Sequence, residues 1–203
     1  MGLLVAGLVV FLGVHLLRAL SEDQRARLLQ TYGVLAYKGT YSIVSVVGLI
    51  LIVAGYAAAR AEPIVLYTPP AGLAHAASLF TVVAFVLLVA AYVPGNWFLL
   101  RLKHPMTLAV KTWAFGHLLA NGGLHDLLLF GSFLVWAILV FRSARRRPAL
   151  QDPSLADGLP AVIASKPSSL LGTLVTLAIG MGAWAWFAFQ GHLLLIGVAP
   201  FAR

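Results

Sequence analysis

Cysteine is absent from the 203-residue sequence, and charged residues are scarce. Without cysteine the chain has no disulfide, no thiolate metal ligand and no cysteine nucleophile. Charged residues make up 10% of the sequence, against about 25% in soluble domains, whereas hydrophobic residues make up 61%. The sequence also contains no phosphate-binding loop, zinc-protease motif or serine-hydrolase elbow. These absences exclude a disulfide scaffold and leave soluble nucleotide-binding enzymes and hydrolases without support.

Acidic residues are especially few, with six Asp and Glu against 14 Lys and Arg. No carboxylate pair falls inside an apolar run, and Asp126 is the one acid near such a run. A proton-coupled transporter usually needs a buried acid, so a transporter is the least favoured class. The basic residues lie in short segments between apolar runs, which is the pattern of cytoplasmic loops rather than of a nucleic-acid surface. No nucleic acid partner is therefore expected.

Six apolar segments approach or reach the length of about 20 residues that crosses a bilayer. The sequence therefore predicts an all-α polytopic transmembrane helix bundle with about six spans, in contact with the lipid bilayer. No basic residue precedes the first apolar run, so it is predicted to be a retained span rather than a cleaved signal. An outside N-terminus places almost every basic residue on the inner side. The predicted spans cover about 3–20, 39–60, 71–93, 105–120, 124–141 and 170–190.

The linear organisation predicts three parts. Residues 1–142 form a five-helix membrane core, residues 143–168 form a polar cytoplasmic linker, and residues 169–203 hold a terminal transmembrane helix. The run Asn121-Gly122-Gly123 is predicted to end the fourth span with C-cap chemistry.

Polar residues inside a membrane are costly and are therefore functional candidates. His15 and His117 are the two histidines well inside predicted spans. At about 100° per residue, His117 shares one face of its helix with Lys111 and Asn121, so this face is predicted to line the bundle interior. A second polar stripe is predicted on the inner half of the 39–60 helix, formed by Lys38, Tyr41, Ser42 and Ser45.

Two histidines on different helices suit axial ligation of a haem iron by neutral imidazole. The cationic side chains of Arg18 and Lys111 suit the two haem propionates. Other interpretations stay open, because the histidines can be packing residues, the cations can be interfacial residues and Asn121 can be a helix cap. The residues predicted to bind the cofactor are His15, His117, Arg18, Lys111, Asn121 and Tyr41, with His15 and His117 as metal ligands.

Seven motifs, in this order along the chain, resemble the NnrU family of bacterial membrane proteins. They lie between about residues 3 and 142, and the segment 170–190 resembles the family only as a terminal apolar span. The resemblance implies a multi-pass protein of the bacterial inner membrane that is associated with nitrite and nitric oxide reduction. The motifs are Phe11-Leu-Gly-Val-His15-Leu-Leu-Arg-Ala, Tyr37-Lys-Gly-Thr-Tyr-Ser42, Tyr67-Thr-Pro-Pro70, Tyr92-Val-Pro-Gly95, Leu102-Lys-His104-Pro-Met106, Val110-Lys-Thr-Trp-Ala-Phe-Gly-His117-Leu-Leu-Ala-Asn-Gly122 and Asp126-Leu-Leu-Leu-Phe-Gly-Ser132.

The NnrU family is also similar to the plant zeta-carotene isomerase, a membrane protein that carries haem b. The haem-ligating histidines of that enzyme lie at positions that look like those of His15 and His117 here. The resemblance therefore implies a haem b site at these residues. The cysteine ligand proposed there has no counterpart here, because the chain has no cysteine, and the reaction does not follow from the resemblance. The implied chemistry is redox, nitrogen-oxide-linked or isomerase chemistry on a small apolar or gaseous substrate. The alternative is a cofactor-free membrane factor that assists assembly of a denitrification reductase, with a membrane protein partner.

Overall fold

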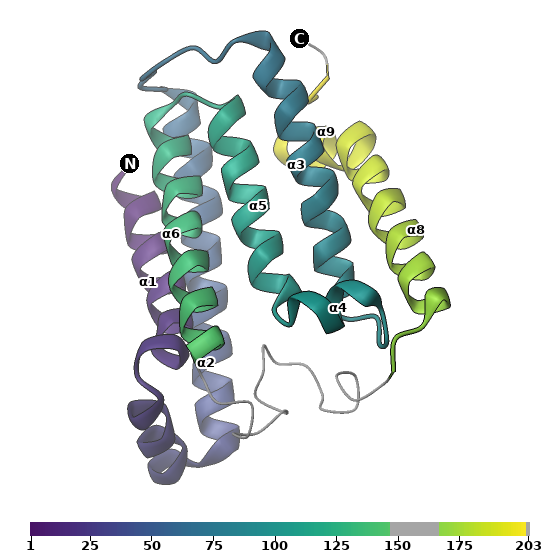
Figure 1. Cartoon of the computed structure of the whole chain (residues 1–203). Helices are drawn as coiled ribbons and strands as arrows, with labels where there is room; N and C mark the ends of the chain where they lie inside the picture. The colour runs from purple at the N-terminus through teal and green to yellow at the C-terminus, as the bar shows by residue number, and fades with distance from the viewer. Residues whose placement is uncertain (147–166, 202–203) are drawn as a thin grey trace. The chain divides into compact units, whose positions relative to one another are not determined.

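The computed structural model describes residues 1–146 and 167–201, and these residues form helices joined by short connections (Figure 1). Within them the one β-type pairing is an isolated bridge between Val65 and Gly123. The predicted all-α class is therefore confirmed. The chain divides into two compact units, each described by itself below. Unit 1 comprises Met1–Thr68 and Asn121–Ser143, and unit 2 comprises Pro69–Ala120 and Ala144–Arg203.

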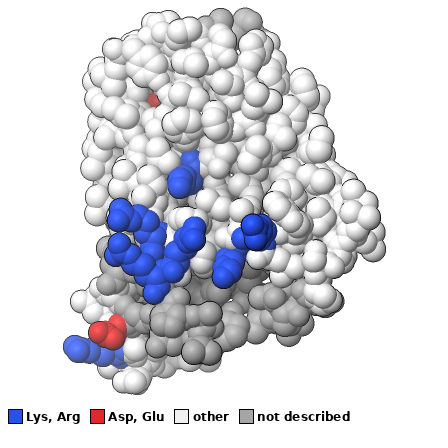
Figure 2. All heavy atoms as spheres, in the orientation of Figure 1, with Lys and Arg blue, Asp and Glu red and all other residues white. Residues whose placement is uncertain are grey.

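Four of the described helical stretches are long and apolar enough to cross a membrane. They are Asp23–Ala61, Gly72–Ala90, Leu124–Arg146 and Leu170–Ile196, and Gly2–Leu17 is a shorter apolar helix. Figure 2 shows the expected consequence, because most of the face that it draws carries neither acidic nor basic side chains. A polytopic helical membrane protein is confirmed, whereas the count of six spans and the outside N-terminus remain predictions.

Unit 1 contains helices α1 (Gly2–Leu20), α2 (Glu22–Ala61) and α6 (Leu124–Arg146). Helix α2 is interrupted at Gly33, whose φ of 77° and ψ of 165° are not helical. A positive φ is readily adopted by glycine because it has no Cβ. The residues before Gly33 thus form a separate helical stretch ahead of the predicted span.

Helices α1 and α2 approach each other closely through glycines on both helices. A Cβ added at Gly7 would lie 2.6 Å from the Ile52 backbone nitrogen, and one at Gly48 would lie 2.8 Å from the Phe11 nitrogen. A Cβ at Gly55 would collide with the backbone of Leu3 and Leu4. Small residues at such positions let transmembrane helices pack by backbone contact.

Helix α6 completes the core of unit 1 through larger side chains. Leu128, Leu129, Phe133 and Trp136 pack against a buried cluster formed by α1 and α2. At the start of α6, the backbone is also tied to the loop after α2, because Leu66 N donates to Gly122 O at 2.8 Å and Leu124 N donates to Ile64 O at 2.8 Å.

The predicted C-cap role of Gly122 and Gly123 is wrong, although the helix does end at Ala120 as expected. Among the described glycines, positive φ values occur at Gly33, Gly95 and Gly197. Glycine is required at position 122 for another reason, because a Cβ there would collide with the Tyr67 carbonyl. The constraint is close contact with the loop after α2, and local sequence does not reveal it.

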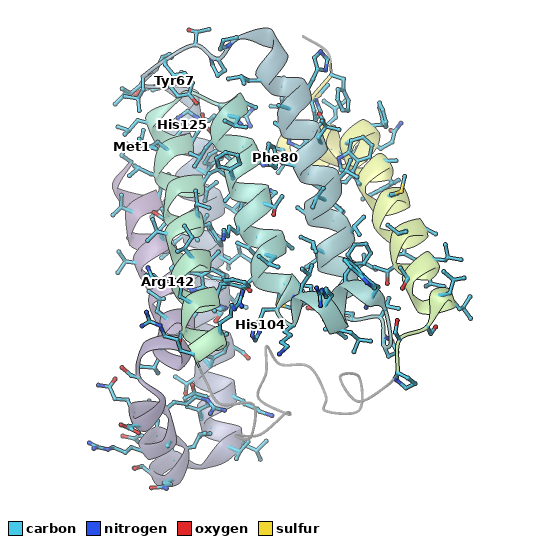
Figure 3. All side chains as sticks on the ribbon, viewed as in Figure 1. Met1, Tyr67, Phe80, His104, His125 and Arg142 are labelled. Carbon is cyan, nitrogen blue, oxygen red and sulfur yellow. The ribbon has the colours of Figure 1, made fainter. Side chains whose placement is uncertain are left out.

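Unit 2 is built around α3 (Ala71–Ala90), on which α5 (Pro105–Ala120) and α8 (Leu170–Trp186) pack. Helix α5 packs on α3 where Gly116 faces Ala77 and Phe80, and Phe80 meets Phe115 edge to face at 5.1 Å (Figure 3). Helix α8 packs on α3 where Gly180 faces Val86 and where Trp184 Nε1 donates to Thr81 Oγ1 at 3.0 Å. The described elements of unit 2 are α3 (Ala71–Ala90), α4 (Trp97–Leu102), α5 (Pro105–Ala120), α8 (Leu170–Trp186), η2 (Phe187–Gly191) and α9 (His192–Ile196).

Asn96 fixes the turn between α3 and α4. Its side chain is fully buried, and its Nδ2 donates to Ala90 O at 2.8 Å and to Val93 O at 2.5 Å. Its Oδ1 accepts from Leu99 N at 2.8 Å and so caps α4. One amide thus satisfies the last carbonyl of α3, a carbonyl of the turn after it and one first-turn N–H group of α4.

We expect Asn96→Ala to lower the free energy of unfolding by about 2–4 kcal/mol, because it removes a cap and leaves buried carbonyls without donors. Thermal unfolding in detergent micelles measures the loss. Asn96→Ser keeps a side-chain acceptor for Leu99 N–H and should unfold between the two. An alanine variant as stable as the wild type would show that water replaces all three bonds.

Candidate functional site

His15 lies on α1 in an aromatic environment within unit 1. Its ring centroid is 4.3 Å from that of Phe11, 5.2 Å from that of Tyr41 on α2 and 6.2 Å from that of Trp136 on α6. All three helices of the unit therefore contribute a ring to this site. Tyr41 was predicted from the sequence to belong to it, whereas Trp136 was not.

The hydrogen bond of His15 determines which ring nitrogen carries a lone pair. His15 Nδ1 lies 2.6 Å from the Phe11 carbonyl oxygen. Since a carbonyl only accepts, Nδ1 is the donor in this bond. A neutral imidazole of this tautomer keeps its lone pair on Nε2, and metal-binding histidines are commonly oriented by such a bond from their other nitrogen.

The indole nitrogen of Trp136 is buried and makes no hydrogen bond within the described part of the chain. Buried N–H donors normally have partners, and an unmet one is destabilising by about 1–3 kcal/mol. The ring of Trp136 lies beside that of His15. A hydrogen-bond acceptor bound in this region of unit 1 would therefore satisfy the indole N–H.

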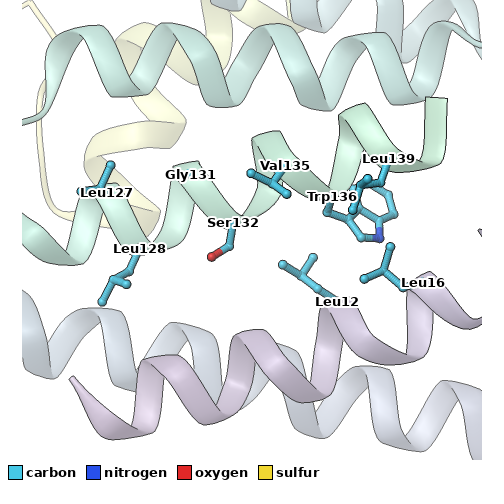
Figure 4. A pocket seen from close by; sticks show the side chains of 9 residues that line it. All are labelled: Leu12, Leu16, Leu127, Leu128, Gly131, Ser132, Val135, Trp136 and Leu139. Atoms are coloured by element: carbon cyan, nitrogen blue, oxygen red, sulfur yellow. The ribbon is translucent and has the colours of Figure 1, made fainter. Parts of the chain in front are cut away.

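A groove of about 410 Å³ runs between α1 and α6 beside this region (Figure 4). Leu12 and Leu16 form its α1 wall, and Leu128, Val135 and Leu139 belong to its α6 wall. The lining also includes Trp136 and the hydroxyl of Ser132. In Figure 4 Ser132 and Trp136 of α6 point toward Leu12 and Leu16 of α1.

His117 on α5, in unit 2, repeats the local arrangement of His15. Its Nδ1 lies 2.9 Å from the carbonyl oxygen of Trp113, four residues earlier, and the two rings are 5.2 Å apart. Nδ1 is again the donor, because the carbonyl can only accept. Each predicted ligand thus follows an aromatic residue by four positions, and the carbonyl of that residue accepts from its Nδ1. Nε2 is the nitrogen left for a metal.

The six predicted cofactor-binding residues fall in both units. Tyr41 and His15 lie together in unit 1, and the backbone carbonyl of Asn121 in the same unit accepts from Tyr67 Oη at 3.0 Å. Lys111 and His117 are half-buried residues of unit 2. Joint ligation by the two histidines therefore remains a prediction. The side chain of Arg18 lies outside the described part of the chain, as does most of the predicted 143–168 linker.

The predicted polar stripe on α2 is only partly inside the unit. Tyr41 and Ser45 are half-buried, and Ser45 Oγ donates to the Tyr41 carbonyl at 2.8 Å. Lys38 and Ser42 are exposed, so Tyr41 and Ser45 are the two members of the stripe with partly buried side chains. The predicted role of the stripe in a polar interior remains a prediction.

A second buried polar group, which the sequence did not single out as a site, joins α2 to α6. Tyr56 Oη donates to Asp126 Oδ1 at 2.6 Å, and Gly123 N donates to Asp126 Oδ2 at 3.1 Å. His125 Nε2 lies 3.5 Å from Asp126 Oδ2, and only 4% of His125 and 6% of Asp126 is exposed. Figure 3 labels His125 close to Tyr67 at this end of the unit. The carboxylate at the third position of α6 is placed to stabilise the helix start and to hold α2 against it.

We expect Tyr56→Phe to destabilise unit 1 by about 1.5–3 kcal/mol, because it removes a buried hydrogen bond to a carboxylate. Thermal unfolding in micelles tests this. Tyr32→Phe is the matched control, since Tyr32 is on the same helix and is 66% exposed. Equal effects of the two variants would show that the Tyr56–Asp126 bond contributes nothing net.

No group of three or more potential metal ligands of the His, Cys, Asp or Glu type occurs among the described residues. A haem differs from such a site, because its porphyrin supplies four nitrogen ligands and the protein supplies one or two. A single histidine is a common protein ligand of haem iron, and His15 and His117 are both of this residue type.

Long apolar helices that carry few acidic and basic residues define an integral membrane protein. A family profile described as NnrU protein matches residues 3–200, and the chain belongs to this family. The match continues past the last sequence motif and includes α8, which the motifs alone did not reach. Comparison with curated proteins finds no match, and comparison with solved structures finds none either.

Proposed function

We propose that this NnrU-family membrane protein binds haem b through His15 and His117. The observation that carries the proposal is the shared orientation of the two rings, in which Nδ1 bonds a backbone carbonyl at 2.6 Å in His15 and 2.9 Å in His117. This bond selects the tautomer with the lone pair on Nε2, and it holds the ring at a constant angle to its helix. Neither ring has to change its proton before it binds iron.

The surroundings of His15 fit a flat apolar group. Phe11, Tyr41 and Trp136 place aromatic rings around the imidazole, with centroids 4.3, 5.2 and 6.2 Å from that of His15. The Trp136 N–H, which makes no hydrogen bond within the described part of the chain, would donate to an acceptor atom of a bound group. The donor chemistry of the region therefore favours a prosthetic group here.

The remaining predicted residues have supporting roles in this proposal. Arg18 and Lys111 would bind the propionates, and Tyr41 would pack beside the imidazole of His15. Asn121 follows His117 by about one helical turn and offers a second polar contact. The bound haem would supply one-electron chemistry or a binding position for a small gas.

The proposed setting is the bacterial inner membrane, with the basic loops on the cytoplasmic side. The proposed reaction class is redox, nitrogen-oxide-linked or isomerase chemistry on a small apolar or gaseous substrate. Family membership supports the membrane setting, and the histidine environment supports the cofactor.

An absorbance spectrum of the protein purified after expression with ample haem tests the proposal. We expect a Soret band, with sharper visible bands after reduction and a pyridine haemochromogen spectrum of b type. Protein that is folded and monodisperse yet carries no Soret band would refute it. That result, together with a co-purifying reductase subunit, would favour the assembly factor instead.

A further inference from the structure

The α6 wall of the groove continues without interruption into a basic residue. Leu128, Ser132, Val135 and Leu139 line the groove, and Arg142 follows at the next step of the same spacing. At about 100° per residue these five positions fall within an arc of about 80° on α6. Arg142 thus lies on the face of the helix that forms the groove, and Figure 3 shows it toward the end of α6 opposite His125.

The charge at this end of α6 is uniformly positive. Arg142 is exposed, and Arg145 and Arg146 occupy the last turn of the same helix. The acid of α6 is Asp126 in its first turn, about 24 Å away along the axis at 1.5 Å per residue. A partner that complements Arg142 on this face therefore carries negative charge.

The length of the groove also matches the hydrocarbon thickness of one leaflet of a bilayer. The α6 row from Leu128 to Leu139 extends about 16 Å, close to half of the roughly 30 Å hydrocarbon core of a bilayer. Val135 is 58% exposed and Leu139 is 38% exposed, so the groove is open at its surface. Its walls are mostly apolar along this length, with the Ser132 hydroxyl as a polar exception, whereas Arg142 lies beyond Leu139.

We propose that the groove binds one anionic phospholipid. An acyl chain lies along Leu128, Val135 and Leu139 and against Leu12 and Leu16 of α1, while the phosphate group pairs with Arg142. The guanidinium is suited to phosphate because it offers paired N–H donors. This site uses neither histidine of the haem proposal, and it shares one lining residue, Trp136, with the surroundings of His15.

Native mass spectrometry tests the site directly. The full-length protein is transferred from micelles that contain equal amounts of phosphatidylglycerol and phosphatidylcholine with identical acyl chains. We expect retention of phosphatidylglycerol over phosphatidylcholine, and Arg142→Gln should reduce this preference about fivefold, the factor for roughly 1 kcal/mol per basic side chain at a membrane surface. Arg27→Gln removes the same charge from an exposed position of α2 and should leave the preference unchanged.

A second variant tests the chain site separately from the headgroup. A Cβ at Gly131 meets only ordinary contact, with Leu127 Cδ1 at 3.7 Å, so Gly131→Leu fills the groove without straining the helix and should reduce retention of both lipids. Gly182→Leu is the matched control, because a Cβ there has nothing within 4 Å. Equal retention of the two lipids by the wild type, or an unchanged preference in Arg142→Gln, would overturn the proposal. Full retention by a folded Gly131→Leu variant would overturn it as well.

Discussion

His15→Ala is expected to reduce the haem bound per protein by at least about tenfold, since even loss of a partner behind a metal ligand reduces affinity 10–100-fold. The substitution removes Nε2 and also the Nδ1 bond to Phe11 O. Alanine is the best helix former, so α1 itself is not weakened. The ratio of Soret absorbance to protein concentration measures the loss, and added imidazole should restore part of the band.

His117→Ala is expected to behave in the same way, and two further histidines serve as controls. His75 is exposed at the start of α3, and His75→Ala should leave the spectrum unchanged. His125→Ala removes a buried histidine from the Tyr56–Asp126 contact and should change stability rather than the spectrum. If His125→Ala alone removed the band, the haem site would lie at that contact and the assignment of His15 would be wrong.

Gly55→Val is expected to have the largest effect on folding. A Cβ at this position of α2 collides with backbone atoms of Leu3 and Leu4 on α1. Backbone atoms cannot move aside as a flexible side chain can, so the helices must separate. Overpacking is typically destabilising by about 1–3 kcal/mol and occasionally by more, and we expect a loss above this range because the clashing atoms at Gly55 are all backbone. The temperature at which the protein in micelles loses monodispersity measures the effect.

Gly39→Val is the matched control for this prediction. Gly39 is on the same helix, and a Cβ there has nothing within 4 Å. The two variants share the loss of glycine and the gain of a β-branched residue, so only the contact with α1 distinguishes them. Equal melting temperatures would mean that α1 and α2 do not pack through Gly55.

Much of the helical framework could be predicted from the sequence. The predicted segments 3–20 and 105–120 correspond to α1 and α5 within one residue at each end. Apolar length is imposed by the solvent, because lipid offers no hydrogen bonds and backbone groups must be satisfied within each segment. The short helix α4 was missed, since its start depends on the buried Asn96 side chain rather than on a long apolar run.

The candidate site was predictable in part for the same reason. Polar residues in apolar runs identified His15 and Tyr41, and the structure places their rings 5.2 Å apart. The contribution of Trp136 was not predictable, because an aromatic residue in an apolar helix is compatible with packing, lipid contact or a site. The bond between Tyr56 and Asp126 joins residues 70 positions apart, and no local pattern encodes such a pair.

The sequence by itself determined that this is a helical membrane protein. Hydrophobic residues make up 61% of the chain and gather in runs long enough to cross a bilayer, so lipid is the environment that suits them. It also determined which polar residues lie within the helices. The tertiary structure alone decided which faces of those helices meet, because close packing at glycines such as Gly48 and Gly55 sets the rotation of α1 against α2. That rotation brings Tyr41 to His15, and the larger side chains of α6 then bring Trp136 to the same ring and leave the groove beside it.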